Sequence, residues 1–343
     1  MSEGTTSATP EMAVVVLSYN GLADTRKCLA SLLPALRTYV APMLVDNGST
    51  DGTSDVVSAE FPWCPIVRVA ENKGPLVGNN AGIRRSLELG ARWIVLLNND
   101  TTVHPDLCER LRDAALAHPQ YDVLGPVIMF MGDPDVVMTE GTVFNPPIPR
   151  GFFLDKRVPL TRTNPPTAVE CDIVNGCCLM ITADMIRKIG LFDERFFMYH
   201  DESDLCLRVL EAGGRLAVVD HELVWHKGNA TSAGTGKKSI RYYDGRNLWL
   251  LLKKHAWAPR NGRSKALTIL VYFRYMFHWY CAEREAGNLP AAAAVLDGVW
   301  DGLTGVDGIY LPRKRRGLGL LRAMFDLGRL FPRWALEPVK RQT

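Results

Sequence analysis

Short apolar, β-branched runs alternate with longer amphipathic stretches along the first hundred residues of the chain. The first run is continuously apolar and β-branched, which is the pattern of a strand buried on both faces of a sheet. The runs are residues 13–18 (AVVVLS), 42–45, 66–70 and 93–97 (WIVLL), and the helical stretches between them are residues 23–36, 54–61 and 79–89. Strands and helices that alternate at this spacing predict right-handed βαβ units, and therefore an α/β fold on a mostly parallel sheet.

The regular pattern then breaks. Residues 126–166 contain eight prolines and predict a long irregular insertion, the usual place for substrate-facing loops. Order returns at residues 169–181, followed by a helix at about 201–211 and a strand at 215–219. Beyond residue 239 the chain is aromatic and helical in pattern, so we expect a helical extension after the α/β part.

Polar side chains follow each predicted strand at its carboxyl end. Because parallel strands end at one edge of a sheet, these clusters should line a single crevice, where open α/β sheets bind their ligands. The clusters are Ser18-Tyr19-Asn20, Asp46-Asn47, Asn72-Lys73-Gly74 and Asn98-Asn99-Asp100. The sequence contains neither G-x-G-x-x-G nor G-x-x-x-x-G-K-[ST], so it supports neither a nicotinamide-binding fold nor a P-loop.

Two residues far apart in the sequence are candidates for binding a metal ion. Asp100 follows a buried strand, and few protein carboxylates are needed when phosphate oxygens and water supply the other ligands of Mg²⁺ or Mn²⁺. Aspartate is also common in turns that end strands, so a structural role stays open. His226 follows the last predicted strand and is available to a metal or a phosphate, although a single histidine is more often structural.

Three carboxylates gather at the start of the helix predicted at residues 201–211. Acidic residues there are favoured by the helix dipole, so capping explains any one of them. Asp204 stands four residues before Arg208, the spacing of an ion pair along a helix, and we assign it to structure. Adjacent Asp201 and Glu202 are harder to explain by capping. Like charges in a desolvated cleft raise a pKa, as a general base for a hydroxyl requires.

The positive charge of the chain is concentrated at its C-terminal end. The 343 residues carry a net charge of +3, with 47% hydrophobic and 22% charged residues. This composition excludes a disordered, collagen-like or coiled-coil protein, and the near-neutral total gives no support for a nucleic-acid partner. Residues 313–343 alone carry +7, and residues 318–331 alternate apolar and basic residues at roughly helical spacing. Two interpretations stay open: a helix lying on an anionic membrane surface, or a helix packed on the protein with a solvated basic face.

The cysteines and the N-terminus bear on the cellular compartment. The eight cysteines form no C-x-x-C pair, which indicates reduced, mostly buried thiols. Residues 1–10 lack the cationic and apolar layout of a secretion signal. The most apolar stretch, residues 266–281, is shorter than a membrane span and is interrupted by Arg274 and His278. We therefore expect a cytoplasmic protein without a membrane anchor of its own.

These segments, in this order, resemble glycosyltransferase family 2, particularly its bacterial rhamnosyltransferase-like branch, whose members have the GT-A fold. The resemblance covers about residues 12–250, and the combination is specific although each piece alone is weak. The matching segments are VVVLSYNG (14–21), LVDNGSTDGT (44–53), ENKG (71–74), GNNAGI (78–83), LLNNDT (96–101), NGCCLMI (175–181), GLFDERFFMYHDESDLCLRVLEAG (190–213), VWHKG (224–228) and RYYDGRN (241–247).

The resemblance implies a nucleotide-sugar site at the strand ends. Asp46 is similar to the acid that holds the nucleotide base in this family. The backbone around Ser18, Tyr19 and Asn20 is similar to the family's nucleoside cradle. The other residues that we expect to contact the nucleotide-sugar on this side are Asn72, Lys73, Asn79 and Asn99.

The resemblance also implies a divalent metal ion, Mg²⁺ or Mn²⁺, at the diphosphate. Asn98 matches the ribose-side position of the family's D-x-D-like motif, and Asp100 matches its metal-coordinating position. His226 matches the late histidine that reaches the metal or the diphosphate. Arg246 would add a further positive charge to the diphosphate, but a surface or helix-end arginine explains it equally well.

Two departures from the family pattern bear on catalysis and on sugar recognition. The family's glutamate-aspartate pair is similar to Asp201-Glu202, but the order is reversed. The position of the catalytic base then falls on Glu202, one methylene longer than aspartate, with Asp201 as the alternative. Residues 75–77 (PLV) stand where the family usually has an aromatic–small pair, which affects the expected sugar recognition.

The implied activity is an inverting hexosyltransferase. Glu202 or Asp201 deprotonates an acceptor hydroxyl, which attacks the anomeric carbon in line while the metal at Asp100 neutralises the departing diphosphate. The donor is expected to be dTDP-rhamnose or a UDP-sugar, and the acceptor a glycan, a lipid-linked saccharide or a natural product. The expected location is the cytoplasm, at the inner membrane face if the basic tail binds lipid. A homodimer is compatible with the sequence.

The expected organisation is a disordered N-terminus (1–11), a GT-A catalytic domain (12–240) and a helical basic extension (241–343). Within the catalytic domain, residues 12–125 form the nucleotide-binding half and residues 126–240 the acceptor-side half. Two other functions stay open. A sugar-1-phosphate nucleotidyltransferase needs a Gly-rich basic loop after the first strand, which SYNGLADTRK lacks. A catalytically silent sugar-nucleotide-binding protein is compatible with amides at positions 98 and 99, where acids are common.

Overall fold

The structure is a computed structural model that describes residues 9–144, 154–157, 167–228, 230–256, 265–311 and 313–328. Its contacts divide the chain into two compact units. Unit 1 comprises residues 1–143, 157–193 and 204–228, and unit 2 comprises residues 144–156, 194–203 and 229–343. Unit 2 thus includes a segment, residues 194–203, that precedes the predicted extension. Most of the tail predicted at residues 1–11 lies outside the described residues.

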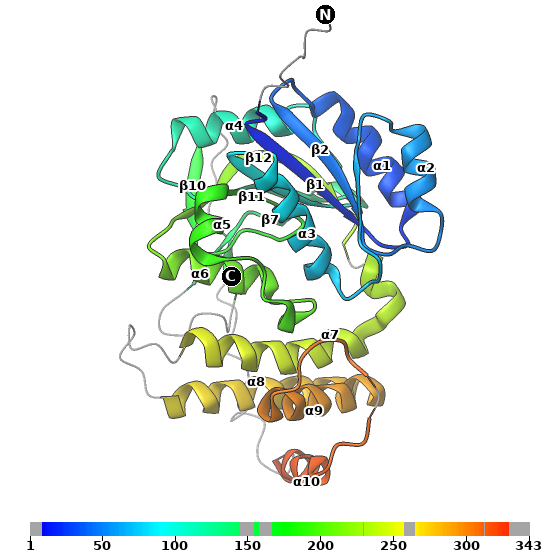
Figure 1. Cartoon of the computed structure of the whole chain (residues 1–343). Helices are drawn as coiled ribbons and strands as arrows, with labels where there is room; N and C mark the ends of the chain where they lie inside the picture. The colour runs from blue at the N-terminus through cyan, green and yellow to red at the C-terminus, as the bar shows by residue number, and fades with distance from the viewer. Residues whose placement is uncertain are drawn as a thin grey trace, which may run out of the picture. The chain divides into compact units, whose positions relative to one another are not determined.

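Unit 1 is built on a ten-stranded sheet (Figure 1). Its main path runs in the order β10 (Ala168–Cys171), β12 (Leu216–His226), β6 (Val123–Phe130), β11 (Cys178–Thr182), β4 (Trp93–Asn98), β1 (Met12–Ser18), β2 (Val40–Asp46) and β3 (Ile66–Arg68). In addition, β5 (Thr101–Val103) pairs with β12, and β7 (Asp133–Thr139) pairs with β6. A separate two-stranded sheet consists of β8 (Thr142–Phe144) and β9 (Leu154–Arg157).

The pairing is parallel where the sequence predicts βαβ units and mixed elsewhere. Strands β3, β2, β1 and β4 run parallel to their neighbours in this group, as do β6 and β12. Strand β11 is antiparallel to both β4 and β6, and β5, β7 and β10 are also antiparallel to their partners. The α/β fold is confirmed, while the parallel arrangement dominates only the N-terminal part of the sheet.

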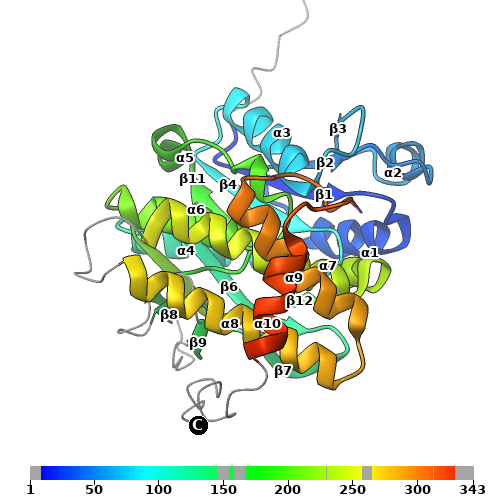
Figure 2. The same ribbon diagram turned by 90° about the horizontal axis from the view of Figure 1, so that it is seen from below.

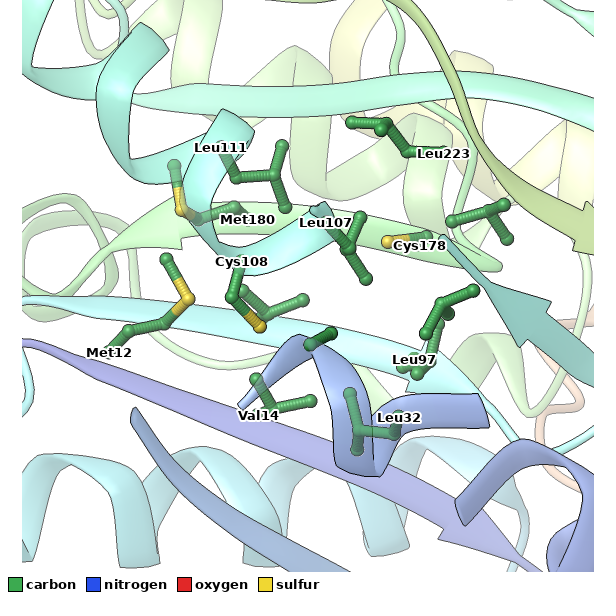
Figure 3. Packing of buried hydrophobic residues seen from close by; sticks show 14 of the residues in the cluster. Met12, Val14, Leu32, Leu97, Leu107, Cys108, Leu111, Cys178, Met180 and Leu223 are labelled. Carbon is green, nitrogen blue, oxygen red and sulfur yellow. The ribbon is translucent and has the colours of Figure 1, made fainter. Parts of the chain in front are cut away.

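Helices pack on both faces of β1. Side chains on one face, such as Val14, join the main core with residues of α1 and α4 (Figure 3). On the other face, Val15 lies against α3, where a Cβ added to Gly82 would be 2.3 Å from Val15 Cγ1. The helices of unit 1 are α1 (Leu22–Leu32), α2 (Thr53–Glu60), α3 (Pro75–Glu88), α4 (Leu107–Ala117) and α5 (Ala183–Ile189), with a 3₁₀ turn at Leu33–Ala35. Helix α6 (Asp201–Glu211) begins in unit 2 and continues into unit 1 from Asp204, and a 3₁₀ turn at Glu194–Phe196 belongs to unit 2.

The prediction of an irregular insertion that begins at residue 126 is wrong for the first part of that segment. Residues 126–130 complete the buried strand β6, and β7 follows at once. The proline content was misleading, because Pro126 fits within the strand. Pairing of β6 with β11 stops at Leu124, so the missing N–H of Pro126 falls outside that ladder. Most of the remaining insertion lies outside the described residues.

Two element boundaries differ from the prediction in ways that affect the site. Helix α3 begins at Pro75 instead of residue 79, because proline suits the first turn of a helix and Gly74 before it has a φ of +108°. The last strand, β12, continues beyond Val219 to His226, so His226 ends a strand and does not merely follow one. The cysteines are all free, and seven of the eight are buried, as predicted.

Unit 2 is mainly helical, as predicted beyond residue 239. Its helices are α7 (Ala230–Leu251), a π-helical turn (Leu252–Ala256), α8 (Lys265–Glu285), α9 (Leu289–Thr304) and α10 (Leu318–Gly328). Helices α7 and α9 meet at glycine, since a Cβ on Gly298 would be 2.1 Å from the Tyr242 carbonyl oxygen. Helix α10 packs against α9 (Figure 2). It also contacts α8, where the ring centroid of Phe325 lies 5.5 Å from that of Phe277. No helix among the described residues has the length and apolar composition needed to cross a bilayer.

Candidate active site

The polar clusters predicted at the strand ends come together at one edge of the sheet. Parallel pairing aligns Ser18 with Asp46 across β1 and β2, and Leu17 with Asn98 across β1 and β4. The carboxyl ends of these three strands are therefore level with one another, so the residues that follow them share one edge. This is the edge where open α/β sheets bind ligands.

Asp46 shapes the loop that follows β2. The side chain is 5% exposed, and its Oδ1 accepts a hydrogen bond from the Ser49 amide (2.9 Å). Its Oδ2 accepts a hydrogen bond from the Ser54 hydroxyl, in the first turn of α2. The carboxylate thus closes a tight loop between β2 and α2.

Hydrogen bonds join a second loop, after β1, to the loop after β2. Asn20 has a φ of +48°, and its Oδ1 accepts a hydrogen bond from the Thr50 amide at 2.7 Å. Asp51 accepts hydrogen bonds from the amides of Leu22 and Thr53. Burial raises the pKa of Asp51, but hydrogen bonds from Thr53 and Leu22 outweigh burial, and the net pKa is lowered. Tyr19, next to the hydrogen-bonded Asn20, remains 47% exposed, so its ring is available to a ligand.

Near the start of α3, Asn72 has a structural role, whereas Lys73 and Asn79 are available to a ligand. The Oδ1 of Asn72 accepts hydrogen bonds from Asn47 Nδ2 (3.1 Å) and from the Gly74 amide (2.9 Å). Lys73 is exposed and 3.8 Å from Glu71, which leaves its ammonium accessible. Asn79, half-buried in α3, makes no hydrogen bond with its side chain among the described residues.

The segment after β4 places its three polar residues differently. Asn99 donates through Nδ2 to the Thr25 hydroxyl (2.9 Å), and Thr25 in turn contacts Ser18 Oγ at 2.8 Å. Asn99 and Ser18 are thus engaged in fixing the start of α1. The Asn98 side chain is half-buried and has no hydrogen-bond partner among the described residues, so it can contact a ligand.

Asp100 and His226 meet although 126 positions separate them. The Nε2 of His226 lies 3.1 Å from Oδ1 of Asp100, and both side chains are largely buried. Backbone pairing fixes the contact: Thr101 of β5 is in register with His226 of β12, and the Lys227 amide donates to the Asp100 carbonyl at 3.0 Å. On its other side, His226 Nδ1 lies 3.4 Å from the Met138 sulfur.

The Asp100–His226 pair fits a divalent cation that is shared with a ligand. A carboxylate oxygen and an imidazole nitrogen at this separation can point at one ion. The described residues contain no group of three or more His, Cys, Asp and Glu side chains that could hold a metal. The protein can therefore supply two ligands here, and phosphate oxygens and water would supply the others, as is common for Mg²⁺.

The predicted carboxylate pair lies in unit 2 at the start of α6. Asp201 and Glu202 are both half-buried. Asp204, in unit 1, is 1% exposed and pairs with Arg208 at 2.8 Å, which agrees with the structural role predicted for it. The three carboxylates at the start of α6 thus comprise Asp204 in a buried ion pair and two half-buried groups, Asp201 and Glu202.

The loop before Asp201 has an uncommon backbone. Phe197, Tyr199 and His200 have φ values of +64°, +64° and +63°, which non-glycine residues rarely adopt. Strain of this kind persists only where the surroundings hold it in place, and it concentrates at functional sites. Asn247 stabilises this backbone, because its Nδ2 donates hydrogen bonds to three loop carbonyls: those of Phe196 (2.9 Å), Met198 (2.7 Å) and Tyr199 (2.8 Å).

Arg246 acts on the same loop. Its guanidinium donates to the carbonyls of Arg195 (3.1 Å), Phe196 (2.5 Å) and Gly308. The side chain is 1% exposed, and burial lowers its pKa. The interpretation of Arg246 as a surface or helix-end arginine is therefore wrong. Its donors are engaged with backbone carbonyls, which accounts for the residue as a structural clamp and leaves the predicted diphosphate contact without geometric support.

Several residues that organise the site were not singled out by sequence reasoning. Asn247 lies in the RYYDGRN segment, directly after Arg246. Nothing in the sequence indicates that it contacts a loop about fifty residues earlier. Asp51 was part of the matched segment DNGSTDGT, in which Asp-Gly is typical of a turn. Met138 lay in the supposed irregular insertion, so its contact with His226 could not be foreseen.

The sheet topology is that of a GT-A-like glycosyltransferase fold, and the polar groups at its strand ends form a ligand-binding edge. The model of the family "Glycosyl transferase family 2" matches residues 13–189, and the chain belongs to this family. The resemblance inferred from the sequence is thereby confirmed, and the chain is identified as a glycosyltransferase. Family membership also favours this activity over a nucleotidyltransferase or a silent binding protein.

Relatives with assigned names are similar over most of their length. The chain is 26% identical over 269 residues to the N-acetylglucosaminyl-diphospho-decaprenol L-rhamnosyltransferase of Mycobacterium tuberculosis, covering 73% of this chain and 87% of that protein. It is 23% identical over 255 residues to the dTDP-rhamnosyl transferase RfbF of Shigella flexneri, covering 70% and 79%. These relatives place the chain near the rhamnosyltransferases of the family.

Solved structures share the fold. S. aureus TarS residues 1–349 in complex with UDP-GlcNAc has a TM-score of 0.53 at 14% identity, covering 86% of this chain and 81% of that one. Against a longer TarS structure the TM-score is 0.56, and the chain spans 53% of that protein's length. A structure of GalNAc-T7 with UDP, GalNAc and Mn²⁺ has a TM-score of 0.54 at 14% identity, covering 76% and 53%.

Proposed function

We propose that the protein is a metal-dependent, inverting glycosyltransferase that moves a sugar from a nucleotide diphosphate to an acceptor hydroxyl. The observation that carries this proposal is the Asp100–His226 pair, 3.1 Å apart at the edge where the strand ends meet. Two ligands of different chemistry, with no third protein ligand among the described residues, suit a cation completed by a diphosphate. Mg²⁺ or Mn²⁺, when bound there, would neutralise the charge that develops on the departing diphosphate.

The donor site is proposed at the loops after β1, β2 and β4. Asp46 and the backbone of residues 18–20 would receive the base and nucleoside, with the half-exposed ring of Tyr19 against the base. Asn98, whose side chain has no partner among the described residues, would contact the ribose. The accessible Lys73 ammonium and the Asn79 amide would contact the phosphates or the sugar, and Asn72 would hold its loop in shape.

The acceptor is activated, in this proposal, by a carboxylate at the start of α6. Glu202 takes the proton from the acceptor hydroxyl, with Asp201 as the alternative base. The hydroxyl oxygen then forms a bond to the anomeric carbon from the face opposite the nucleotide, while the bond to the diphosphate oxygen breaks. A single displacement inverts the anomeric configuration. The buried clamp formed by Arg246 and Asn247 orders the backbone that leads into these carboxylates.

Substrate identity is proposed from the relatives' names. A rhamnosyl donor such as dTDP-rhamnose is favoured because two of the relatives are named as rhamnosyltransferases, one of them for a dTDP-rhamnosyl group. The acceptor is proposed to be a saccharide on a lipid diphosphate, since the mycobacterial relative is named for such an acceptor. Action at the cytoplasmic membrane face, through the basic C-terminal part, belongs to the same proposal. A homodimer and a natural-product acceptor remain compatible with it.

Thermal unfolding with a panel of UDP-, dTDP- and GDP-sugars, each with and without Mn²⁺ or Mg²⁺, tests the proposal. One nucleotide class should raise Tm by about 4 °C at a concentration about 100-fold above its Kd, and the rise should require the metal. A stabilisation of equal size in EDTA would refute the metal-dependent site. The absence of stabilisation by any nucleotide-sugar would refute the donor site as a whole.

A further inference from the structure

Helix α10 carries two apolar stripes, about 110° apart around the helix axis. Leu321 and Phe325 face inward, with exposures of 6% and 5%. Leu320, Met324 and Leu327 stand at spacings of four and three residues, which aligns them along one face of a helix. Their exposures are 72%, 59% and 61%, so this outer stripe packs against nothing in the described chain.

Unpaired positive charges accompany the outer stripe. Lys314, Arg316 and Arg322 are exposed and form no ion pair among the described residues. Their neighbours Arg313 and Arg315 differ, because both are bound to the buried Asp301 at 2.7 and 2.8 Å. The basic residues therefore divide into two that hold unit 2 together and three that are exposed. Lys314 and Arg316 lie in the segment before α10, whereas Arg322 lies within α10, about 170° around the helix from the outer stripe.

We propose that the outer stripe of α10 (Leu320, Met324 and Leu327), together with Lys314 and Arg316 of the segment before it, binds the surface of a bilayer rich in anionic phospholipid. The apolar stripe enters the boundary between headgroups and acyl chains, and the side chains of Lys314 and Arg316 contact lipid phosphates. Helices with this division of apolar and basic residues lie in the membrane interface. Membrane binding by α10 extends the acceptor side of the proposed function, and its biological purpose rests on that function. Vesicle binding itself can be tested without it.

The charge of the face argues for lipid over a second copy of the chain. A twofold dimer through this face would bring two sets of the same basic side chains together, and like charges that meet across an interface oppose association. An anionic bilayer supplies the opposite sign. It also supplies an apolar layer into which three partly exposed side chains can be withdrawn from water.

Sedimentation of the full chain with sucrose-loaded vesicles tests the proposal. Wild type should bind vesicles of phosphatidylglycerol and phosphatidylcholine and should bind pure phosphatidylcholine vesicles much less. K314Q/R316Q should lower partition onto the anionic vesicles about 30-fold, because each cation near such a surface contributes to binding. L320Q/M324Q/L327Q should lower it about tenfold or more through the lost apolar insertion.

Matched controls separate the face from general charge and apolarity. K27Q/R84Q removes two exposed cations from unit 1, and L33Q/L116Q removes two leucines that are 49% and 46% exposed there. Both should bind vesicles as wild type does. Equal binding by the α10 variants and wild type, or equal loss in the controls, would overturn the proposal. So would a dimer in light scattering that the α10 substitutions abolish, which would assign the face to a second copy.

Discussion

The imidazole of His226 and the carboxylate of Asp100 are 3.1 Å apart because an antiparallel pairing of β5 with β12 sets Thr101 opposite His226. Asp100→Asn keeps the shape of the side chain but removes the charge that a divalent cation requires. We expect kcat to fall about 100-fold or more. Chelation by EDTA should bring wild type down to the level of the variant and leave the variant unchanged. Asp113→Asn, an exposed carboxylate of α4, should behave as wild type in both assays.

The two carboxylates at the start of α6 can be ranked by substitution. Glu202→Gln should lower kcat by about 10²–10⁴-fold, the contribution typical of a general base, and should leave donor binding unchanged. Asp201→Asn should have a much smaller effect. Steady-state rates and nucleotide-sugar affinity for both variants decide the matter, and the reverse order would transfer the role of base to Asp201.

Asn247 offers a test of the strained loop. Asn247→Ala removes the donor to three carbonyls, and residues 197–200 then lose the contacts that hold their positive φ values. Because this loop leads directly to Asp201 and Glu202, we expect kcat to fall at least about tenfold with little change in donor Kd. Asn288→Ala removes the N-cap of α9 and should cost about 1 kcal/mol of stability without lowering kcat. Equal kcat values in the two variants would show that Asn247 stabilises the fold only.

Asp301 gives unit 2 a pH-dependent contribution to stability. Burial raises its pKa, but hydrogen bonds from Arg315, Arg313 and Tyr242 outweigh burial, and the net pKa is lowered. A carboxyl with a lower pKa in the folded state stabilises the fold above its unfolded pKa of about 4, and this contribution is lost as pH falls through the folded value. Asp301→Asn should therefore cost about 3 kcal/mol near pH 7 and progressively less below pH 4, measured by urea unfolding. A difference that stays constant down to pH 2 would contradict this account.

We expect substitution by alanine to have different effects on stability at two helical glycines. At Gly82 of α3, a Cβ would lie 2.3 Å from Val15 and 3.1 Å from Val45. Gly82→Ala should destabilise the protein by about 1–3 kcal/mol through overpacking. Gly319 of α10 has no neighbouring atom within 4 Å of the added Cβ, so Gly319→Ala should be neutral or stabilising by about 0.5–1 kcal/mol. Urea midpoints of the two variants that shift in the same direction would refute the packing model of α3.

The sequence was sufficient for the parallel part of the fold because each strand there is a short, mainly apolar run followed by polar residues. It also indicated Asp100 and His226 through a family resemblance, and the backbone pairing that joins them depends on strands far apart in the chain. Proline counts misled the prediction at β6, where the tertiary pairing tolerates Pro126. The role of Arg246 could not be read from the sequence, since its partners are backbone carbonyls and these carry no sequence signal.

Residues 194–203 belong to the same compact unit as the helices that begin at residue 230, and Asn247 donates to the carbonyls of that segment. A protein ending at residue 240 would keep the whole sheet and lose the groups that order the approach to Glu202. We expect such a truncated chain to retain nucleotide-sugar binding and lose transfer. For engineering, exchange of the C-terminal helices between relatives would have to carry the segment 194–203 with them. Natural recombination at residue 240 faces the same constraint, so the two stretches are expected to evolve as one inherited unit.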